Sequence, residues 1–390
     1  MLSALDRNGR SCSLIHNTKE EIRQLKQNEN YYCPVCKEKV LVRAGKKVIP
    51  HFSHFAKTNC LANANGGEGA YHESGKLQLY HWLCRLGFHV KLEPYIEQIS
   101  QRPDLLFEFH GKIMALEYQC ATIPLEEMEK RTSAFKSIGI YPFWILGGNH
   151  FNRMSTNTIR LNTFQQSFIH SFPHDLRMFF FCADSGHFLV CKNMIPKGKK
   201  SFFTSIHSSK LPNLTFPQLF GPIPLNRRTF YTHWANYVKK VRTTPVRHPT
   251  KAELAWRNEL YRKGMHPSLL PSICYLPTPH QILSSDPPWF WQSRILLRSL
   301  LDAPLHSRIS LRLPLKQFSF PLIESDQDPW TAYMDRLVDL GLIEMTNSLQ
   351  YRKIRHIKLP ATVDEALSQD RQTFHQLSQA KGRFSFEKNS

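Results

Sequence analysis

The clearest pattern of apolar and polar positions in the chain runs from residue 104 to residue 119. It reads DLLFEFHGKIMALEYQ, two mostly apolar segments joined by a His-Gly-Lys turn at 110–112. Two such segments around a short glycine-containing turn are typical of a β-hairpin. Folding the hairpin about Gly111 would place Asp104 opposite the segment that begins at Glu117. The pattern therefore predicts that two carboxylates meet at the open end of an otherwise apolar hairpin.

Elements of alternating type flank this hairpin and predict a mixed α/β (α+β) fold. Apolar residues at helical spacing alternate with short apolar runs that suit strands. The expected elements, in chain order, are a helix at about 72–86, a strand at 88–96, the two hairpin strands, a helix at 124–137 and a strand at 141–148. A second hairpin is expected within 175–220, turning at the Asp-Ser-Gly sequence of 184–186.

Composition along the chain predicts three domains. Residues 1–62 are strand-rich and hold clustered cysteine and histidine residues, and the small, glycine-rich segment 60–70 is typical of a linker. The mixed α/β pattern occupies 66–220. From about 225 to 390 the chain becomes basic and mainly helical.

Net charge narrows the choice of partner. The 390 residues include 51 Lys and Arg against 31 Asp and Glu, a formal net charge of +20. Such an excess favours a polyanion as the binding partner, with nucleic acid ahead of an anionic membrane.

The sequence also indicates where the protein acts. The first residues lack a secretion-signal pattern, the longest apolar runs are too short to span a bilayer, and the nine cysteines, an odd number, do not suggest a disulfide framework. A cytoplasmic protein without a membrane partner is expected.

The paired hairpin carboxylates suggest metal chemistry. Like charges in a partly dry site repel each other, and a divalent cation would remove this cost. Carboxylate pairs that bind Mg²⁺ are the usual apparatus for cutting phosphodiesters. The alternative is a salt-bridged sheet end without metal. Glu73, on the apolar face of the first expected helix, either complements the helix dipole or points at the hairpin as a third acidic ligand.

Several motifs together resemble one known family. They are CPVC at 33–36, HFSH at 51–54, RPDLLF at 102–107, LEYQCATIPLEEMEKRT at 116–132 and FWILGG at 143–148. The α-β-β-β-α-β order with RPD and LEYQ resembles the PD-(D/E)XK nuclease superfamily, a restriction-endonuclease-like fold. The whole combination, over residues 1 to about 150, resembles the competence protein CoiA family. This resemblance implies a PD-(D/E)XK core behind a small zinc-binding N-terminal module.

The resemblance also implies roles for individual residues. Asp104 and Glu117 would bind Mg²⁺ or Mn²⁺. The main-chain carbonyl of Tyr118 would add a ligand, and Glu73 would be the helix carboxylate.

Gln119 stands where the superfamily usually has Lys. Gln can make only neutral hydrogen bonds, so it would orient water or phosphate without supplying charge. Gln is also the form expected in CoiA-like members. The positive charge would then come from Lys130 or Arg131 on the following helix.

A second candidate site consists of Cys33 and Cys36 followed by His51 and His54, with Cys60 nearby. Two thiolates two residues apart on a knuckle bind Zn²⁺ readily, and the run between the pairs is typical of a hairpin that would return the histidines to the knuckle. The histidine spacing is shorter than in common zinc fingers, so Cys60 could replace one of them and the fourth ligand stays open. The alternative is a free CxxC with structural histidines.

Two segments of the C-terminal region are candidates for DNA contact. Segment 227–242 has an apolar helical stripe that we expect in a core. Its basic residues are expected toward solvent: Arg227, Arg228, Lys239, Lys240 and Arg242. Segment 328–359, an amphipathic helix followed by a basic hairpin, resembles a winged helix whose wing would carry Arg352 and Lys353. A packing unit without DNA contact is the alternative for this region.

Together these patterns predict a metal-dependent deoxyribonuclease. The family resemblance implies that it acts in natural competence, on transformation and recombination of incoming DNA. The alternative is a non-catalytic mediator that binds single-stranded DNA and recruits a recombinase, with the acidic site purely structural. The Gln at position 119 is the feature that favours this alternative.

Overall fold

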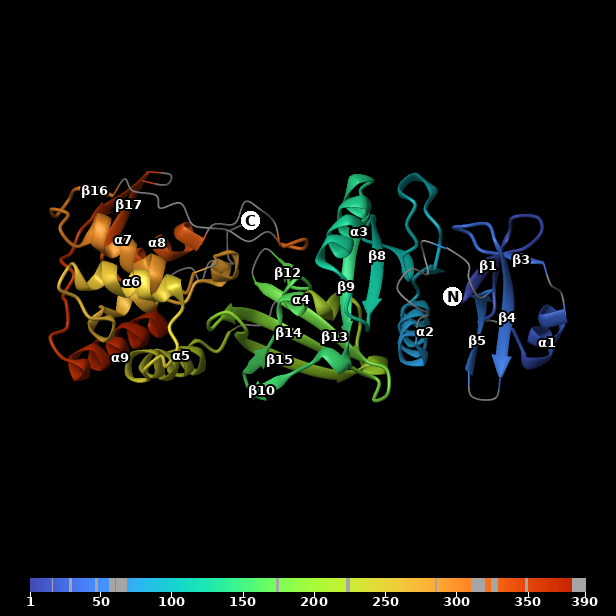
Figure 1. Cartoon of the computed structure of the whole chain (residues 1–390), viewed down its shortest axis with the longest axis horizontal. Coiled ribbons are helices and arrows are strands. Elements are labelled where there is room, and N and C mark those ends of the chain that lie inside the picture. Colours follow the sequence, from blue (N-terminus) through green and yellow to red (C-terminus); the bar gives the residue numbers. More distant parts are fainter. Residues whose placement is uncertain are drawn as a thin grey trace.

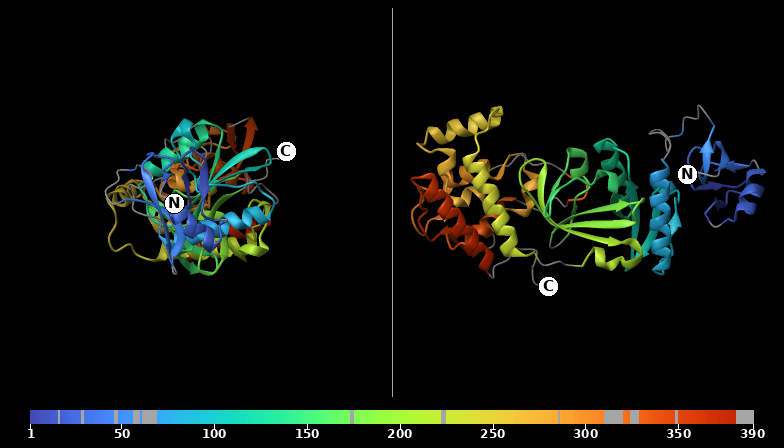
Figure 2. Two further views of the ribbon diagram at one scale, coloured as in Figure 1. Left: turned by 90° about the vertical axis from the view of Figure 1, so that its right-hand side faces the viewer. Right: turned by 90° about the horizontal axis from the view of Figure 1, so that it is seen from below.

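The computed structural model has three parts that follow one another along its longest axis in chain order (Figures 1 and 2). A small sheet comes first, then a large mixed sheet, then a mainly helical region. The structure describes the following residues: 1–15, 17–27, 30–45, 48–55, 60, 69–172, 175–221, 225–284, 286–309, 320–323, 329–347 and 350–380. Residues 61–68, most of the expected linker, lie outside this set.

The N-terminal sheet has five strands in the order β2-β1-β3-β4-β5. Its elements are β1 (Ser3–Leu5), β2 (Ser11–Ser13), α1 (Lys19–Gln27), β3 (Tyr31–Tyr32), β4 (Lys39–Gly45) and β5 (Val48–His54). Helix α1 packs against β4, and a small core forms around Ile22, Val40 and Phe52. A module with such a small apolar core has low intrinsic stability, so a bound metal or another cross-link would stabilise it considerably.

The central sheet has ten strands, in the order β10-β11-β15-β14-β13-β9-β8-β7-β6 with β12 paired to β13. The strands are β6 (Lys91–Leu92), β7 (Leu105–Phe109), β8 (Lys112–Gln119), β9 (Tyr141–Gly147), β10 (Arg153–Ser155), β11 (Thr158–Arg160), β12 (His170–Ser171), β13 (Leu176–Cys182), β14 (His187–Pro196) and β15 (Ser201–Lys210). The helices are α2 (Ala70–Arg85), α3 (Leu125–Ser137) and α4 (Thr163–Gln166). Strand β9 is parallel to both neighbours, β8 and β13.

The β7–β8 hairpin has the predicted turn and register. His110 and Gly111 form a two-residue turn with φ values of 48° and 74°, the left-handed backbone that a tight hairpin turn requires. Leu105 pairs with Leu116, so the next position outward places Asp104 opposite Glu117. The second expected hairpin is β13–β14, which turns at 183–186.

Both faces of the central sheet are covered, which explains its almost continuous apolar strands. Along β9, Phe143 and Ile145 face the core that contains α2, whereas Trp144 and Leu146 face the opposite core, which includes Met128 of α3. Helix α2 lies between the N-terminal sheet and the central sheet and packs against β5 and β8 (Figure 1). A Cβ on Gly75 would lie 2.2 Å from Cε1 of Tyr118, so this helix approaches β8 through its glycine.

The C-terminal region has five helices among the described residues and one three-stranded sheet, in the order β16-β18-β17. Its elements are α5 (Arg227–Thr243), α6 (Lys251–Tyr261), α7 (Pro288–Ile295), β16 (Arg308–Ile309), α8 (Pro329–Asp339), β17 (Ile343–Asn347), β18 (Gln350–Lys353) and α9 (Val363–Gln379). Helix α8 followed by the β17–β18 hairpin has the expected order of helix and wing. No described helix is long and apolar enough to cross a membrane.

Two sequence expectations about these elements were wrong. The strand expected at 88–96 is reduced to β6, because Glu93 adopts a left-handed φ of 46° that ends it. In α5, Arg242 is not on the solvent face. It is buried and forms a bidentate ion pair with Asp370 of α9, at 2.7 and 2.8 Å. The apolar stripe of α5 is buried as expected.

Candidate functional site

The two hairpin carboxylates meet at the open end of β7 and β8, as the sequence predicts. Asp104 precedes β7 and is 8% exposed, and Glu117 on β8 is 3% exposed. The backbone N–H of Tyr118 donates to Oδ2 of Asp104 at 2.8 Å, which ties the start of one strand to the end of the other. The pair is therefore built into the sheet and is not carried by a loop.

Glu117 lies on the face of β8 that α3 covers. Arg131 of α3 forms an ion pair with Oε1 of Glu117 and stacks its guanidinium over the ring of Trp144. Burial raises the pKa of Glu117 to about 7; Arg131 opposes this shift and the negative charge of Asp104 adds to it. A buried carboxylate with a raised pKa beside a second carboxylate is a group that gains from a nearby cation.

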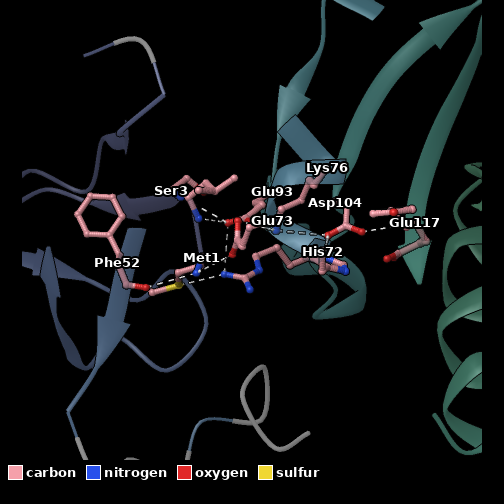
Figure 3. A network of polar contacts seen from close by, with 12 residues as sticks. Met1, Ser3, Phe52, His72, Glu73, Lys76, Glu93, Asp104 and Glu117 are labelled. Atoms are coloured by element: carbon pink, nitrogen blue, oxygen red, sulfur yellow. Dashed lines mark hydrogen bonds and ion pairs between the residues drawn. The ribbon is translucent and has the colours of Figure 1, made fainter. Parts of the chain in front are cut away.

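The amine of Lys76, on α2, lies among three carboxylates (Figure 3). It forms an ion pair with Glu93, and it lies 3.6 Å from Oε2 of Glu73 and 3.7 Å from Oδ1 of Asp104. The Lys76 side chain is fully buried. His72 on the same helix turn adds its Nε2 at 3.5 Å from Oδ1 of Asp104.

The N-terminal sheet reaches this cluster through the first residues of the chain. The backbone N–H groups of Leu2 and Ser3 donate to Oε2 of Glu93 at 2.8 and 3.4 Å. The Met1 ammonium lies 3.6 Å from Oε1 of Glu73 (Figure 3). Glu93 therefore bridges two structural parts of the molecule.

The other residues expected at this site are placed as follows. Glu73 is buried on α2, yet Lys76 stands between it and Asp104. The Nε2 of Gln119 donates to the Ala121 carbonyl at 2.8 Å, so this amide holds the loop after β8. Arg131 reaches the carboxylates, whereas Lys130 is exposed on α3 and makes no polar contact with the described residues. The carbonyl of Tyr118 as a metal ligand stays a prediction.

Sequence reasoning missed Lys76 and Glu93. Lys76 follows Glu73 by three residues, so it lies on the same helix face, and that spacing was the available signal. Glu93 gave none, because it lies in a segment expected to be strand and its role depends on residues about 90 positions earlier.

A second cluster lies at the end of the N-terminal sheet. Ligand atoms of Cys33, Cys36, His54 and Cys60 all lie within 4.8 Å of one another. The sulfurs of Cys33 and Cys60 are 3.9 Å apart, and Sγ of Cys36 is 3.3 Å from Nε2 of His54. Three thiols and one imidazole converging on a point are a donor set that fits tetrahedral Zn²⁺. In the described part of the chain, this is the one group of three or more Cys, His, Asp and Glu side chains that is so compact.

His51 does not belong to this cluster, so of the ligand sets left open by the sequence the structure brings together the one with His54 and Cys60. His51 and His54 are three residues apart on β5, and such positions point to opposite faces of a strand. His54 faces the cysteines, and Cys60 completes the set. In the structure all nine cysteines are free thiols.

The C-terminal basic residues differ in their access to a partner. Lys353 was expected on a wing but is 1% exposed, and its Nζ donates to the carbonyls of Leu301 and Ala303 at 3.2 and 2.7 Å. It therefore serves packing. Arg352, its neighbour on β18, points outward beside Glu344. Lys239 and Lys240 are exposed on α5.

The mixed sheet that holds the buried carboxylate pair lies in a part of the chain that matches a nuclease-like domain. Residues 68–224 match the family model "Competence protein CoiA, nuclease-like domain", and residues 14–63 and 230–367 match the N-terminal and C-terminal domain models of the same family. The chain is 31% identical over 272 residues to "Competence protein CoiA" of Bacillus subtilis (strain 168), an alignment that covers 70% of this chain and 72% of that relative. The chain belongs to the competence protein CoiA family. No solved structure matches it significantly.

Proposed function

We propose that the nuclease-like domain is a divalent-metal-dependent deoxyribonuclease of the PD-(D/E)XK type that acts on DNA taken up during competence. The observation that carries this proposal is the buried pair Asp104 and Glu117, opposed in register at the end of a hairpin in a nuclease-like domain. Two carboxylates suffice, because Mg²⁺ is commonly held by one or two carboxylates together with water and phosphate oxygens.

Asp104 and Glu117 would hold Mg²⁺ or Mn²⁺. A divalent metal bound there supplies an activated water molecule and stabilises the charge that develops on the phosphate. Arg131 and Lys76 place two positive charges beside the carboxylates, and these charges offset negative charge that would otherwise repel the phosphate of a substrate. The amide nitrogen of Gln119 is bonded to the Ala121 carbonyl, so its Oε1 would be the atom that orients water, without adding charge. The cluster Cys33, Cys36, His54 and Cys60 would hold a structural Zn²⁺.

Two isosteric variants test this proposal. Asp104→Asn and Glu117→Gln each remove one anionic ligand and keep the shape of the side chain. We expect cleavage of single- or double-stranded DNA with Mn²⁺ to fall by more than about 100-fold in either variant. DNA affinity should persist, because removing negative charge does not weaken attraction to phosphate.

Glu108→Gln is the matched control, since Glu108 is an exposed residue of β7 on the same hairpin. It should cleave like the parent. Parent-like cleavage by both site variants would end the nuclease assignment at these residues.

One observation favours a second candidate, a non-catalytic mediator that binds single-stranded DNA and recruits a recombinase. Within the protein, four cationic groups already face four carboxylates. The cations are the Met1 ammonium, Lys76, Arg102 and Arg131, and the carboxylates are Glu73, Glu93, Asp104 and Glu117. A self-neutralised cluster of this kind is what a purely structural sheet end needs. In that case purified protein would bind DNA but would not cleave it with either metal.

A further inference from the structure

The position of Lys76 depends on Glu93. Burying an ammonium group is costly unless charged partners surround it, and Glu93 is the nearest of the three carboxylates around this amine. Glu93 is itself 3% exposed. Its Oε1 faces Lys76, while its Oε2 accepts the N–H groups of Leu2 and Ser3 and lies 3.9 Å from Arg102. One oxygen of this carboxylate thus contacts helix α2, and the other contacts the N-terminal module.

The N-terminal segment that binds the Glu93 carboxylate, Leu2 and Ser3 at the start of β1, is hydrogen-bonded to the strands that carry the thiol-imidazole cluster. Strand β1 pairs with β3 at Tyr32, the residue before Cys33. The N–H of Phe52 on β5 donates to the Met1 carbonyl at 2.8 Å, and His54 follows two residues later. Displacement of the cluster residues would therefore move the backbone amides that fix Glu93.

We propose that the N-terminal module controls the carboxylate site by holding Lys76 in place, with Glu93 as the positioning residue between them. Lys76 is then the cation that Gln119 does not supply, and the site is complete only while the N-terminal sheet is docked on α2. The catalytic part of this statement rests on the proposed nuclease function. The structural part, that the module determines the burial of Lys76, does not.

The variant Glu93→Gln breaks this bridge without changing its size. A carboxylate accepts hydrogen bonds on both oxygens, whereas an amide carries one acceptor and one donor group. In either orientation, the Gln amide nitrogen must face a donor: the Lys76 ammonium on one side or the Leu2 and Ser3 amides on the other. The matched control is Glu97→Gln, an exposed position four residues further on.

The test is pulse acetylation of the full-length protein with acetic anhydride, with peptide mass spectrometry to measure each lysine. Lys76 should react slowly in the parent and in Glu97→Gln, and about tenfold or more faster in Glu93→Gln, because local opening limits the reaction of a buried amine. Lys192 serves as the internal standard. It is 2% exposed on β14 and donates to two backbone carbonyls, so it reports opening of the nuclease-like domain as a whole.

A second variant, Cys36→Ser, tests the route from the cluster, and Lys76 should again become reactive while Lys192 stays protected. Lys76 that stays protected in both variants would overturn the proposal. So would equal exposure of Lys76 and Lys192, since the module would then support the whole domain and not this side chain.

Activity gives an independent reading. In Glu93→Gln, kcat for DNA cleavage should fall while the KM for DNA stays close to that of the parent. Acetylation needs no cleavage, so the failure of the nuclease proposal, seen as active Asp104→Asn and Glu117→Gln variants, is distinguishable from failure of this one.

Discussion

Ionisable side chains buried in the central sheet are kept either charged by a partner or neutral by their surroundings. Arg177 is ion-paired with Asp175 at 2.6 Å, and both are almost fully buried. His170 has no such partner among the described residues. Its Nε2 donates to the Trp144 carbonyl at 3.1 Å, and aromatic rings surround it. Burial lowers the pKa of His170 to about 4, so this side chain is neutral at physiological pH.

His170 should make the nuclease-like domain sensitive to acid. Its pKa is about 4 in the folded protein and about 6.5 in the unfolded chain, so the unfolded state takes up a proton first as the pH falls. The free energy of unfolding should therefore decrease below pH 6.5, by about 2 kcal/mol at pH 5. His170→Gln retains a donor and does not titrate, so its thermal midpoint should shift less between pH 7.5 and 5.0. Calorimetry would measure this.

The control for this experiment is His89→Gln at an exposed position. It should keep the full acid sensitivity of the parent. An equal shift in the His170 and His89 variants would contradict the assignment of this sensitivity to His170.

At the scale of the element, the features that could be predicted from the sequence are those set by pairing between neighbouring segments of the chain. The β7–β8 register follows from the turn and the alternation of side chains, so the opposition of Asp104 and Glu117 was predictable. The contact between Glu93 and the N-terminal strand was not, because it joins segments with no shared periodicity. The members of the thiol-imidazole cluster were half predictable. Because side chains alternate along a strand, His51 and His54 cannot both face the cysteines, but the tertiary position of the cysteines decides which of the two does.

The N-terminal cluster should bind one Zn²⁺ per chain. Elemental analysis of freshly purified protein should find about one equivalent, independent of added Mg²⁺, and Cys36→Ser should lose it and destabilise residues 1–62. A matched pair of histidine variants refines the test. His54→Ala should lose zinc, whereas His51→Ala should retain it. Protein that contains no zinc, or that loses it in the His51 variant, would refute this ligand set.

The wing hairpin separates two neighbouring basic residues by face. Arg352→Glu should weaken DNA binding several-fold with little loss of stability, because its contact with Glu344 is an exposed ion pair. Lys353→Met should instead lower stability and leave DNA binding by the folded protein unchanged. It leaves two carbonyls without their donor and should lower the free energy of unfolding by about 1–3 kcal/mol. Fluorescence anisotropy with labelled DNA and thermal melts would measure the two effects.

If Arg352→Glu binds DNA like the parent, this region is better described as a packing or partner-docking unit. Lys353 cannot make the DNA contact expected from the sequence for either outcome, since its side chain is interior.

At the scale of the whole molecule, the net charge of +20 acts over a longer distance than any single contact. The buried ion pairs use part of this charge internally, as Arg177, Arg242 and Lys76 illustrate. Exposed groups such as Lys239 and Lys240 remain at the surface and set long-range attraction.

DNA affinity should therefore fall steeply with salt. Binding that neutralises several phosphates releases counterions, and the slope of log K against log salt reports their number. Replacing Lys239 and Lys240 together by Gln should reduce this slope by roughly 1–2 if both contact the backbone. A flat salt dependence of the parent would mean that the charge serves another purpose.

The central sheet ends in a very short strand at each edge. On one side is β6, with two residues, and on the other is β10, with three exposed residues that include Arg153. A free edge invites pairing with a strand of another molecule, and short or charged edges discourage it. The mostly buried strands β9, β13 and β14 each have a neighbour on both sides. Pairing between the central sheets of two copies is therefore disfavoured, which lowers the tendency of the protein to aggregate through its sheet edges.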